Sequence, residues 1–314
     1  MKRPRRLDAA ELKRFPLPAR DGGDKDGNGR ILIIAGSRDV PGAPLLTAHA
    51  AMRVGAGKLQ LAAPDDIAVP LGIAMPEALV VGFATARDGG FARPAVAAMV
   101  ARAEGADAIV AGPAMTANAA TRELAARLVA LGKPLALDAA LLHALPEFDD
   151  KAREAGQPPV LLPHAGEMAS LLGCEVEEVE ADPLGSGRAC ATRYGAMVLV
   201  KGVESHVVAP DGAAWRFTGG VPGLGISGSG DVLAGIVGGL LARGADPLTA
   251  LLWGACGFTA APAPASPSAS AKSASSPASS PGRCRGYYNR HPGPEPGSAC
   301  LKRRMTADPG SSPG

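Results

Sequence analysis

The sequence has few aromatic residues, no paired cysteine motif and no long apolar run. Aromatic residues make up 4% of its 314 residues, so aliphatic side chains and alanine must fill the core. The five cysteines are an odd number without a Cys-x-x-Cys pair, which argues against a disulfide framework and a zinc site. The start of the chain lacks the apolar stretch of a secretory signal, and segments 232–242 and 247–258 are shorter than the roughly 20 residues of a membrane span. We therefore expect a cytoplasmic protein without a membrane contact.

Positive charge is scarce in the middle of the chain. Residues 1–20 and residues 259–314 each carry 7 basic and 2 acidic residues, whereas residues 21–258 carry 18 basic and 26 acidic residues. A nucleic-acid surface needs clustered lysine and arginine, so the acidic middle argues against nucleic acid as a partner.

The composition changes sharply near residue 259. Residues 259–314 contain 10 prolines and 11 serines, and their only large aliphatic residues are Leu301 and Met305. Such a segment buries too little apolar surface to offset the entropy of ordering it. The sequence therefore predicts a flexible basic arm over residues 1–20, one folded domain over residues 21–258, and a disordered Pro/Ser-rich tail over residues 259–314.

Short apolar runs alternate with segments of helical spacing. Residues 30–36 form a continuous apolar run that ends in glycine, which is typical of a strand buried on both faces of a parallel sheet. Similar runs occur at 59–62, 108–111, 135–137, 159–162 and 197–200, and segments of helical spacing at 44–54, 93–104, 119–131, 165–172 and 189–194. This alternation predicts an α/β fold with a mostly parallel central sheet and helices on both faces. A Pro-Asp-Gly turn predicts a hairpin of residues 207–209 and 214–217.

Glycine is concentrated just before a predicted helix at residues 232–243. Gly228, Ser229 and Gly230 precede Asp231, so backbone N–H groups and the positive end of the helix dipole form an anion site there. The spacing is not that of a P-loop, and no Gly-x-Gly-x-x-Gly follows the first strand. Asp231 is either a helix cap or a base that the helix dipole keeps ionised by lowering its pKa.

Polar residues follow three other predicted strands. His164 and Glu167 lie where open α/β sheets bind ligands, or else Glu167 caps the next helix and His164 is a surface loop residue. Lys201 occupies the equivalent place after the run at 197–200. Asp138, after the run at 135–137, is either a site residue or the cap of the next helix. The spacing contains no Ser-His-Asp triad and no metal-ligand cluster.

Eight motifs occur in a characteristic order between residues 28 and 258. They are Gly36-Ser37, Pro41-Gly42-Ala43, Arg53-Val54-Gly55-Ala56-Gly57-Lys58, Pro76-Glu77-Ala78, Gly112-Pro113, Pro163-His164-Ala165-Gly166-Glu167, Lys201-Gly202 and Gly228-Ser229-Gly230-Asp231-Val232-Leu233-Ala234-Gly235. In this combination the chain resembles the ADP-dependent NAD(P)H-hydrate dehydratase family, a ribokinase-like group. The resemblance implies a ribokinase-like catalytic domain that dehydrates NADH or NADPH hydrated at C6, with ADP or ATP as co-substrate and Mg²⁺ as cofactor.

The resemblance also implies roles for individual residues. The nucleotide would be held by Lys201, Gly202, Val203, Glu204, Ser205, Gly228, Ser229 and Gly230, and the hydrated dinucleotide would be lined by Ala43, Ala114, His164 and Asp231. Asp231 would be the catalytic base for phosphoryl transfer to the C6 hydroxyl, after which phosphate leaves with the oxygen. No residue is assigned to the metal ion, for which Glu167 acting through a water is the one candidate.

The chain departs from the family's pattern in several places. Ala114 replaces the second glycine of Gly-Pro-Gly, residues 138–140 lack a second polar residue, and Ser205 replaces threonine. The Pro/Ser tail stands where the family continues with further helices, so C-terminal helices of the predicted domain are missing. Two alternatives stay open: a ribokinase-like kinase of a small alcohol of the thiazole or pyrimidine type, and an inactive or binding-only remnant.

Two expectations concern partners. About 28 residues precede the region of resemblance, too few for the epimerase that is sometimes fused to this family. We therefore expect a separate NAD(P)H-hydrate epimerase, and we expect the chain to form a homo-oligomer.

Overall fold

The computed structural model describes residues 3–19, 27–143, 145–146, 157–220 and 225–259. These residues contain a ten-stranded sheet. In spatial order its strands are β1 (Arg5–Arg6), β10 (Ala214–Phe217), β9 (Ser205–Val208), β8 (Met197–Val200), β7 (Val160–Leu161), β6 (Leu135–Leu137), β5 (Ala108–Ala111), β2 (Arg30–Ile34), β3 (Lys58–Pro64) and β4 (Ala78–Phe83). Every pair of neighbours is parallel except the two pairs that contain β9. The predicted mostly parallel sheet is therefore confirmed.

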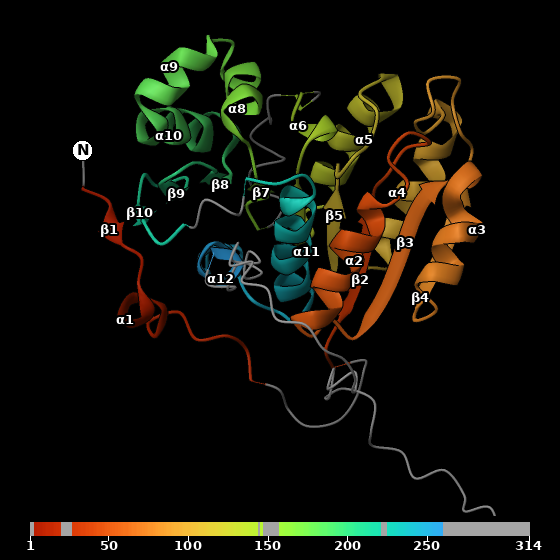
Figure 1. Cartoon of the computed structure of the whole chain (residues 1–314), viewed down its shortest axis with the longest axis horizontal. Helices are drawn as coiled ribbons and strands as arrows, with labels where there is room; N and C mark the ends of the chain where they lie inside the picture. The colour runs from red at the N-terminus through yellow and green to blue at the C-terminus, as the bar shows by residue number, and fades with distance from the viewer. Residues whose placement is uncertain (1–2, 20–26, 144, 147–156, 221–224, 260–314) are drawn as a thin grey trace, which may run out of the picture. The chain divides into compact units, whose positions relative to one another are not determined.

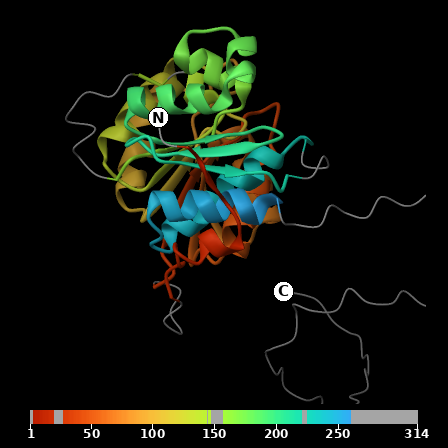
Figure 2. The same cartoon turned by 90° about the vertical axis from the view of Figure 1, so that its left-hand side faces the viewer.

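Helices cover both faces of this sheet (Figures 1 and 2). Strand β2 shows why: Leu32 and Ile34 face one apolar cluster, whereas Ile31 and Ile33 face another, and all four are buried. The first cluster takes side chains from α4 (Val96–Glu104), α5 (Ala119–Ala130), α6 (Ala140–His143), α8 (Ala165–Leu172), α9 (Val176–Ala181) and α10 (Pro183–Tyr194). The second takes them from α1 (Ala9–Leu12), α2 (Ala43–Arg53), α11 (Ser229–Ala242) and α12 (Pro247–Thr259). A short 3-10 helix, η1 (Arg93–Ala95), precedes α4.

The glycines inside α11 allow this helix to pack unusually closely. A Cβ at Gly235 or Gly239 would collide with the backbone of α2, and one at Gly238 would collide with Val110 of β5. The close contact of α11 with α2 and β5 explains why glycine is tolerated despite its cost of about 1 kcal/mol relative to alanine. This close packing holds α11 against the centre of the sheet (Figure 1).

Two elements at one end of the sheet have no counterpart in the sequence-based prediction. Strand β4 is an edge strand whose burial does not follow a clean alternation, and α3 (Asp65–Ala74) contains Pro70 in its interior. Pro70 obscures the helical pattern, because proline normally interrupts a helix. Helix α3 still packs through Ile67 and Leu71.

The N-terminal segment differs from the expected flexible arm. Strand β1 pairs in parallel with β10, Asp8 caps α1 by accepting from Ala10 and Glu11, and Leu7 and Leu12 are buried. Charge counting pointed to a solvated tail, but these two leucines anchor the segment in the second apolar cluster. The prediction of a flexible arm over residues 1–20 is therefore wrong for residues 3–19.

The predicted tail lies almost wholly outside the described residues. Helix α12 extends to Thr259, and residues 260–314 belong to the part of the chain that the structure does not describe. Among the described residues, no helix combines the length and the apolarity that a membrane crossing demands.

Candidate functional site

Two strand ends and the first turn of α11 meet at one edge of the sheet. Asp138 directly follows β6 and Lys201 directly follows β8, and the Lys201 Nζ lies 3.0 Å from Oδ1 of Asp138. The Asp138 side chain is 5% exposed, so the ion pair is largely shielded from water. A Cβ built on Gly230 would lie 3.6 Å from Oδ2 of Asp138 and 3.8 Å from the Lys201 Nζ. The pair thus lies directly beside the predicted anion site.

The start of α11 has the backbone of an anion cradle. Gly228 stands at the N-cap with a φ of +85°, a conformation that residues with a Cβ rarely adopt. The first N–H groups of a helix have no carbonyl one turn earlier within the helix, and they carry the positive end of its dipole. Ser229 and Gly230 are small, so a phosphate can approach this backbone closely.

Asp231 in this first turn has a raised pKa. Burial is the largest cause and the negative charge of Asp138 the second, while Lys201 acts in the opposite direction, and together they raise the pKa to about 6. The prediction of a lowered pKa for Asp231 is therefore wrong, because burial and a neighbouring carboxylate raise it. At pH 7 the group is still about nine-tenths ionised. A carboxylate with a pKa near neutrality suits a general base.

His164 and Glu167 form a reciprocal cap at the start of α8. The His164 Nδ1 accepts hydrogen bonds from the backbone N–H groups of Gly166 (3.0 Å) and Glu167 (3.3 Å), and Glu167 Oε2 accepts one from the His164 backbone (2.9 Å). Glu167 is buried, whereas 59% of the His164 side chain is exposed. Glu167 therefore caps the helix, as one sequence-based alternative held, and His164 keeps an exposed ring edge at the end of β7.

No metal centre is assembled from side chains in the described ranges. None of these residues form a group of three or more histidines, cysteines, aspartates or glutamates that could hold a metal ion. The carboxylate of Glu167 is occupied by the cap and by the His164 Nε2 at 3.2 Å.

Ala114 has a strained backbone at the end of β5. Its φ is +50°, and together with Ala139 at +47° it is one of two described residues other than glycine with a positive φ. A left-handed conformation costs an alanine roughly 1–2 kcal/mol. The departure from Gly-Pro-Gly noted in the sequence therefore places a Cβ where the backbone itself favours glycine.

Hydrogen bonds tie the remaining strand ends to the same edge. The Lys201 N–H donates to the carbonyl of Pro163, which precedes His164, and the Gly36 N–H donates to the carbonyl of Pro113, which precedes Ala114. A Cβ on Gly112 would collide with the backbone of Asp138, so the loops after β5 and β6 are also in contact.

The loop Lys201–Ser205 connects β8 to β9. Val203 is almost fully exposed, the Glu204 carboxylate lies 3.4 Å from Arg216 of β10, and Ser205 opens β9 opposite Phe217. Ala43, the first residue of α2, is buried. Leu46 of the same helix lies so close to Gly228 that a Cβ there would approach its Cδ1 to 2.5 Å.

The structure adds Asp138 to the predicted site. The sequence left two interpretations of Asp138 open, a site residue or a helix cap, because it does not show the order of the strands in the sheet. Its one signal was its place directly after a buried strand.

Comparison with known proteins points to one family. The family model described as NAD(P)H-hydrate dehydratase matches residues 31–278. The chain is 47% identical to the ADP-dependent (S)-NAD(P)H-hydrate dehydratase of Xanthomonas campestris over 253 residues, which are 80% of this chain and 85% of that protein. It is 31% identical to the bifunctional NAD(P)H-hydrate repair enzyme of Escherichia coli, covering 82% of this chain but only 47% of that protein.

A solved structure shares the fold. The ADP/ATP-dependent NAD(P)H-hydrate dehydratase of Bacillus subtilis, co-crystallized with ATP/Mg²⁺, aligns with a TM-score of 0.68 and 25% identity, covering 82% of this chain and 87% of the other. The ribokinase-like fold is also shared with an Enterococcus faecalis protein described as a member of that superfamily, at a TM-score of 0.66 and 23% identity. Because the family model covers most of the chain and the Xanthomonas campestris relative is 47% identical, this chain belongs to the NAD(P)H-hydrate dehydratase family.

Proposed function

We propose that the protein restores NADH and NADPH from their C6-hydrated forms, NAD(P)HX, in an ADP-dependent dehydration. The observation that carries the proposal is the juxtaposition of three features: the glycine cradle at Gly228–Gly230, the buried Asp138–Lys201 pair, and the Asp231 carboxyl with a pKa of about 6. The relative at 47% identity that is named for this reaction supports the choice of substrate.

Asp231 acts as the base in this proposal. Its carboxylate takes the proton of the C6 hydroxyl while the terminal phosphoryl group of ADP moves to that oxygen, which releases AMP. The N–H groups of the cradle and the Lys201 ammonium stabilise the charge that develops on the phosphoryl oxygens. Phosphate then leaves with the C6 oxygen, and loss of a ring proton restores the double bond.

The other predicted site residues are proposed to surround the two ligands. The loop after β8, here called the nucleotide loop, consists of Lys201, Gly202, Val203, Glu204 and Ser205. It holds the nucleotide together with Gly228, Ser229 and Gly230. Ala43, Ala114 and His164 line the hydrated dinucleotide with Asp231. His164 contacts this substrate through the ring edge that its cap leaves exposed.

Mg²⁺ is proposed to enter with the nucleotide. The described residues hold no ready-made metal cluster, and Glu167 is committed to its cap. Mg²⁺ commonly binds through the phosphates of a nucleotide with few protein ligands and supplies charge neutralisation there. The phosphates held at the cradle are therefore the better ligands than Glu167.

Partners and location remain predictions. An NAD(P)H-hydrate epimerase is the expected functional partner, because relatives named as bifunctional repair enzymes extend well beyond the region matched by this chain. We retain the expectations of a homo-oligomer and of a cytoplasmic location.

The test is an assay with hydrated NADH, ADP and Mg²⁺. We expect the absorbance of reduced nicotinamide to recover only when ADP or ATP is present, with AMP and phosphate, or ADP and phosphate, as the other products. Formation of a phosphorylated thiazole or pyrimidine alcohol from ATP, without recovery from the hydrate, would favour the kinase. Nucleotide binding without either reaction would identify a binding-only remnant.

A further inference from the structure

The N-terminal brace, residues 5–18, begins as an outermost strand of the sheet next to β10 and continues through α1 towards α11 and α12. Arg5 and Arg6 pair with Trp215 and Arg216, and the Leu7 N–H donates to the Arg216 carbonyl at 2.8 Å. Strand β1 is parallel to β10, and β10 runs in the same direction as β8 because both are antiparallel to β9. The brace therefore leaves the sheet at the end of the strands where β8 ends and the nucleotide loop begins. The described part of β10 thus has β9 on one side and the brace on the other.

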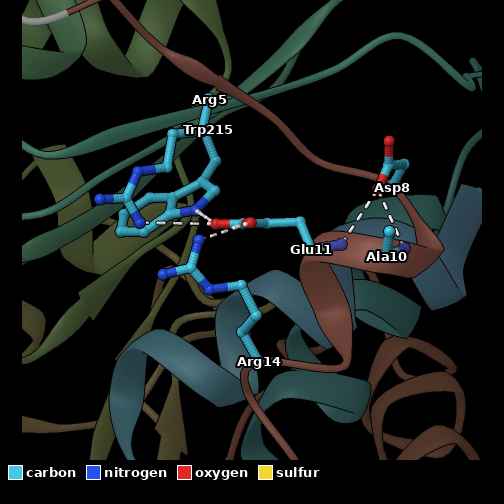
Figure 3. A network of polar contacts seen from close by, with 6 residues as sticks. All are labelled: Arg5, Asp8, Ala10, Glu11, Arg14 and Trp215. Carbon is cyan, nitrogen blue, oxygen red and sulfur yellow. Dashed lines mark hydrogen bonds and ion pairs between the residues drawn. The ribbon is translucent and has the colours of Figure 1, made fainter.

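Glu11 lies at the centre of the contacts between the brace and β10 (Figure 3). One of its oxygens accepts a hydrogen bond from the Trp215 indole N–H at 3.0 Å, and Arg5 and Arg14 lie 3.5 and 3.3 Å from the carboxylate. The Arg5 guanidinium also lies over the Trp215 ring, 5.7 Å from its centroid. The Trp215 hydrogen bond is the largest cause that lowers the pKa of Glu11, followed by the charges of Arg14 and Arg5. The carboxylate is therefore ionised and fully engaged at neutral pH.

The far end of the brace is fixed to the helices below the sheet. The Trp253 indole of α12 donates to the Phe15 carbonyl at 2.7 Å, and Arg243 donates to the Pro18 carbonyl at 3.3 Å. The Phe15 ring packs edge-on against Trp215 at 5.8 Å. The brace thus joins the end of α11 and the middle of α12 to β10.

Strand β10 carries this attachment to the nucleotide loop. Arg216 lies next to Trp215 and its guanidinium lies 3.4 Å from Glu204, while Phe217 pairs in register with Ser205. Both Glu204 and Ser205 belong to the loop Lys201–Ser205. The polar and backbone contacts of two loop residues therefore depend on where β10 lies.

We propose that the brace is a positioning segment for nucleotide binding: through Glu11 and Trp215 it holds β10, and through Arg216 and Phe217 it holds the loop Lys201–Ser205 in place. This role rests on the proposed function of that loop. It assigns to Glu11 and Trp215 an effect on nucleotide binding, although neither residue belongs to the loop Lys201–Ser205. Loss of the attachment lets the hairpin and the loop open together, because local opening follows the contacts that are removed.

The test compares Glu11→Ala with Glu123→Ala by hydrogen–deuterium exchange and ADP titration. Glu123 is a matched control, because its carboxylate also lies between two arginines, Arg93 and Arg127, but on α5. We expect Glu11→Ala to speed exchange in peptides that cover residues 201–208 and 214–217 by about 10-fold, without a change at residues 108–111, and to weaken ADP binding by about 3- to 10-fold. Glu123→Ala is expected to change neither.

The outcomes separate this role from general stabilisation. Faster exchange throughout the chain, or ADP affinity unchanged while the loop exchanges faster, would overturn the positioning role. If Glu11→Ala does not fold, Trp215→Phe replaces it, because phenylalanine keeps a ring for Arg5 and Phe15 and removes the indole N–H. Absence of ADP binding in the unmodified protein would reject the proposed function alone, and the exchange pattern would still decide whether the brace holds the loop.

Discussion

Asp231 and Glu11 are carboxyl groups with opposite surroundings. Asp231, at the start of α11, is partly buried beside another carboxylate, and its pKa rises to about 6. Glu11, in the brace, is surrounded by an indole donor and two arginines, and its pKa falls. The comparison shows that one fold gives two carboxyl groups different tasks. Glu11 is hydrogen-bonded and ion-paired and holds two elements together, whereas Asp231 has a raised pKa that suits it to accept a proton.

The largest expected effect comes from removing the poised acid. Asp231→Asn keeps the size of the side chain but cannot accept the hydroxyl proton. The N-cap of α11 is Gly228 and no side chain caps this helix, so the substitution removes no helix cap. A positioned base contributes typically 10²–10⁴-fold to a rate, so we expect kcat to fall by at least about 100-fold while ADP still binds. Turnover close to that of the unmodified enzyme would remove Asp231 from the mechanism.

The second test removes the neighbour that helps to raise the Asp231 pKa. In Asp138→Asn a negative charge next to Asp231 disappears, so the acid limb of the pH profile of kcat/KM should move to lower pH. Lys201 also loses its 3.0 Å partner, and we expect kcat to fall on the order of 10-fold as the ammonium loses its orientation. Asp107→Asn, at the opposite end of the strands where Asp107 accepts from the Arg30 backbone, is the control. An unshifted acid limb in Asp138→Asn would contradict the electrostatic account.

The His164 side chain is hydrogen-bonded as the cap of α8, as Glu11 is in the brace, yet 59% of it is exposed. His164→Ala removes the cap and the ring, whereas His164→Asn removes the ring and keeps a capping side chain. If the ring edge contacts substrate, both variants should raise the KM for hydrated NADH by a similar factor, about 3- to 10-fold. A normal KM in the asparagine variant, measured with initial rates, would show that only the cap matters.

Replacing each of the two carboxyl groups by a neutral amide should change the Tm in opposite directions. Ionisation of Asp231 costs stability as pH rises above its unfolded pKa of about 3.8, so Asp231→Asn should raise Tm by a few degrees at pH 7 and by less at pH 4. The lowered pKa of Glu11 adds stability above its ordinary value of 4.5 that is lost as pH falls, so Glu11→Gln should lower Tm at pH 7 and by less at pH 4. Calorimetry at both pH values checks the signs. If both variants changed the Tm in the same direction at pH 7, the contrast between the surroundings of Asp231 and Glu11 would be wrong.

The smallest expected effect concerns the strained loop after β5. Ala114→Gly relieves a φ of +50° but increases the entropy of the unfolded chain, so stability should change by no more than about 1 kcal/mol. Affinity for the dinucleotide should stay the same or improve, because a methyl group leaves the place where the backbone approaches ligand. A binding titration that shows a clear loss of affinity would mean that the Ala114 methyl contributes to binding.

Much of the fold follows from local pattern. The buried runs around residues 31–34, 108–111 and 197–200 became strands where predicted, because continuous apolar stretches of this length suit strands covered on both faces. The hairpin strands also formed, with β9 at Ser205–Val208 shifted from the predicted 207–209. Strand β4 and helix α3 escaped prediction, because an uneven burial pattern and an internal proline hide them.

By itself, then, the sequence determined the α/β alternation, the glycine cradle before α11 and the motifs of the family, since all of these lie within short stretches of chain. Tertiary structure alone decided which groups meet: Asp138 and Lys201 are 63 residues apart, and Glu11 and Trp215 are 204 apart. It also decided the direction of the Asp231 pKa, which the helix dipole alone would have lowered. The physical reason is that burial and neighbouring charge depend on the order of strands in the sheet, and no local pattern encodes that order.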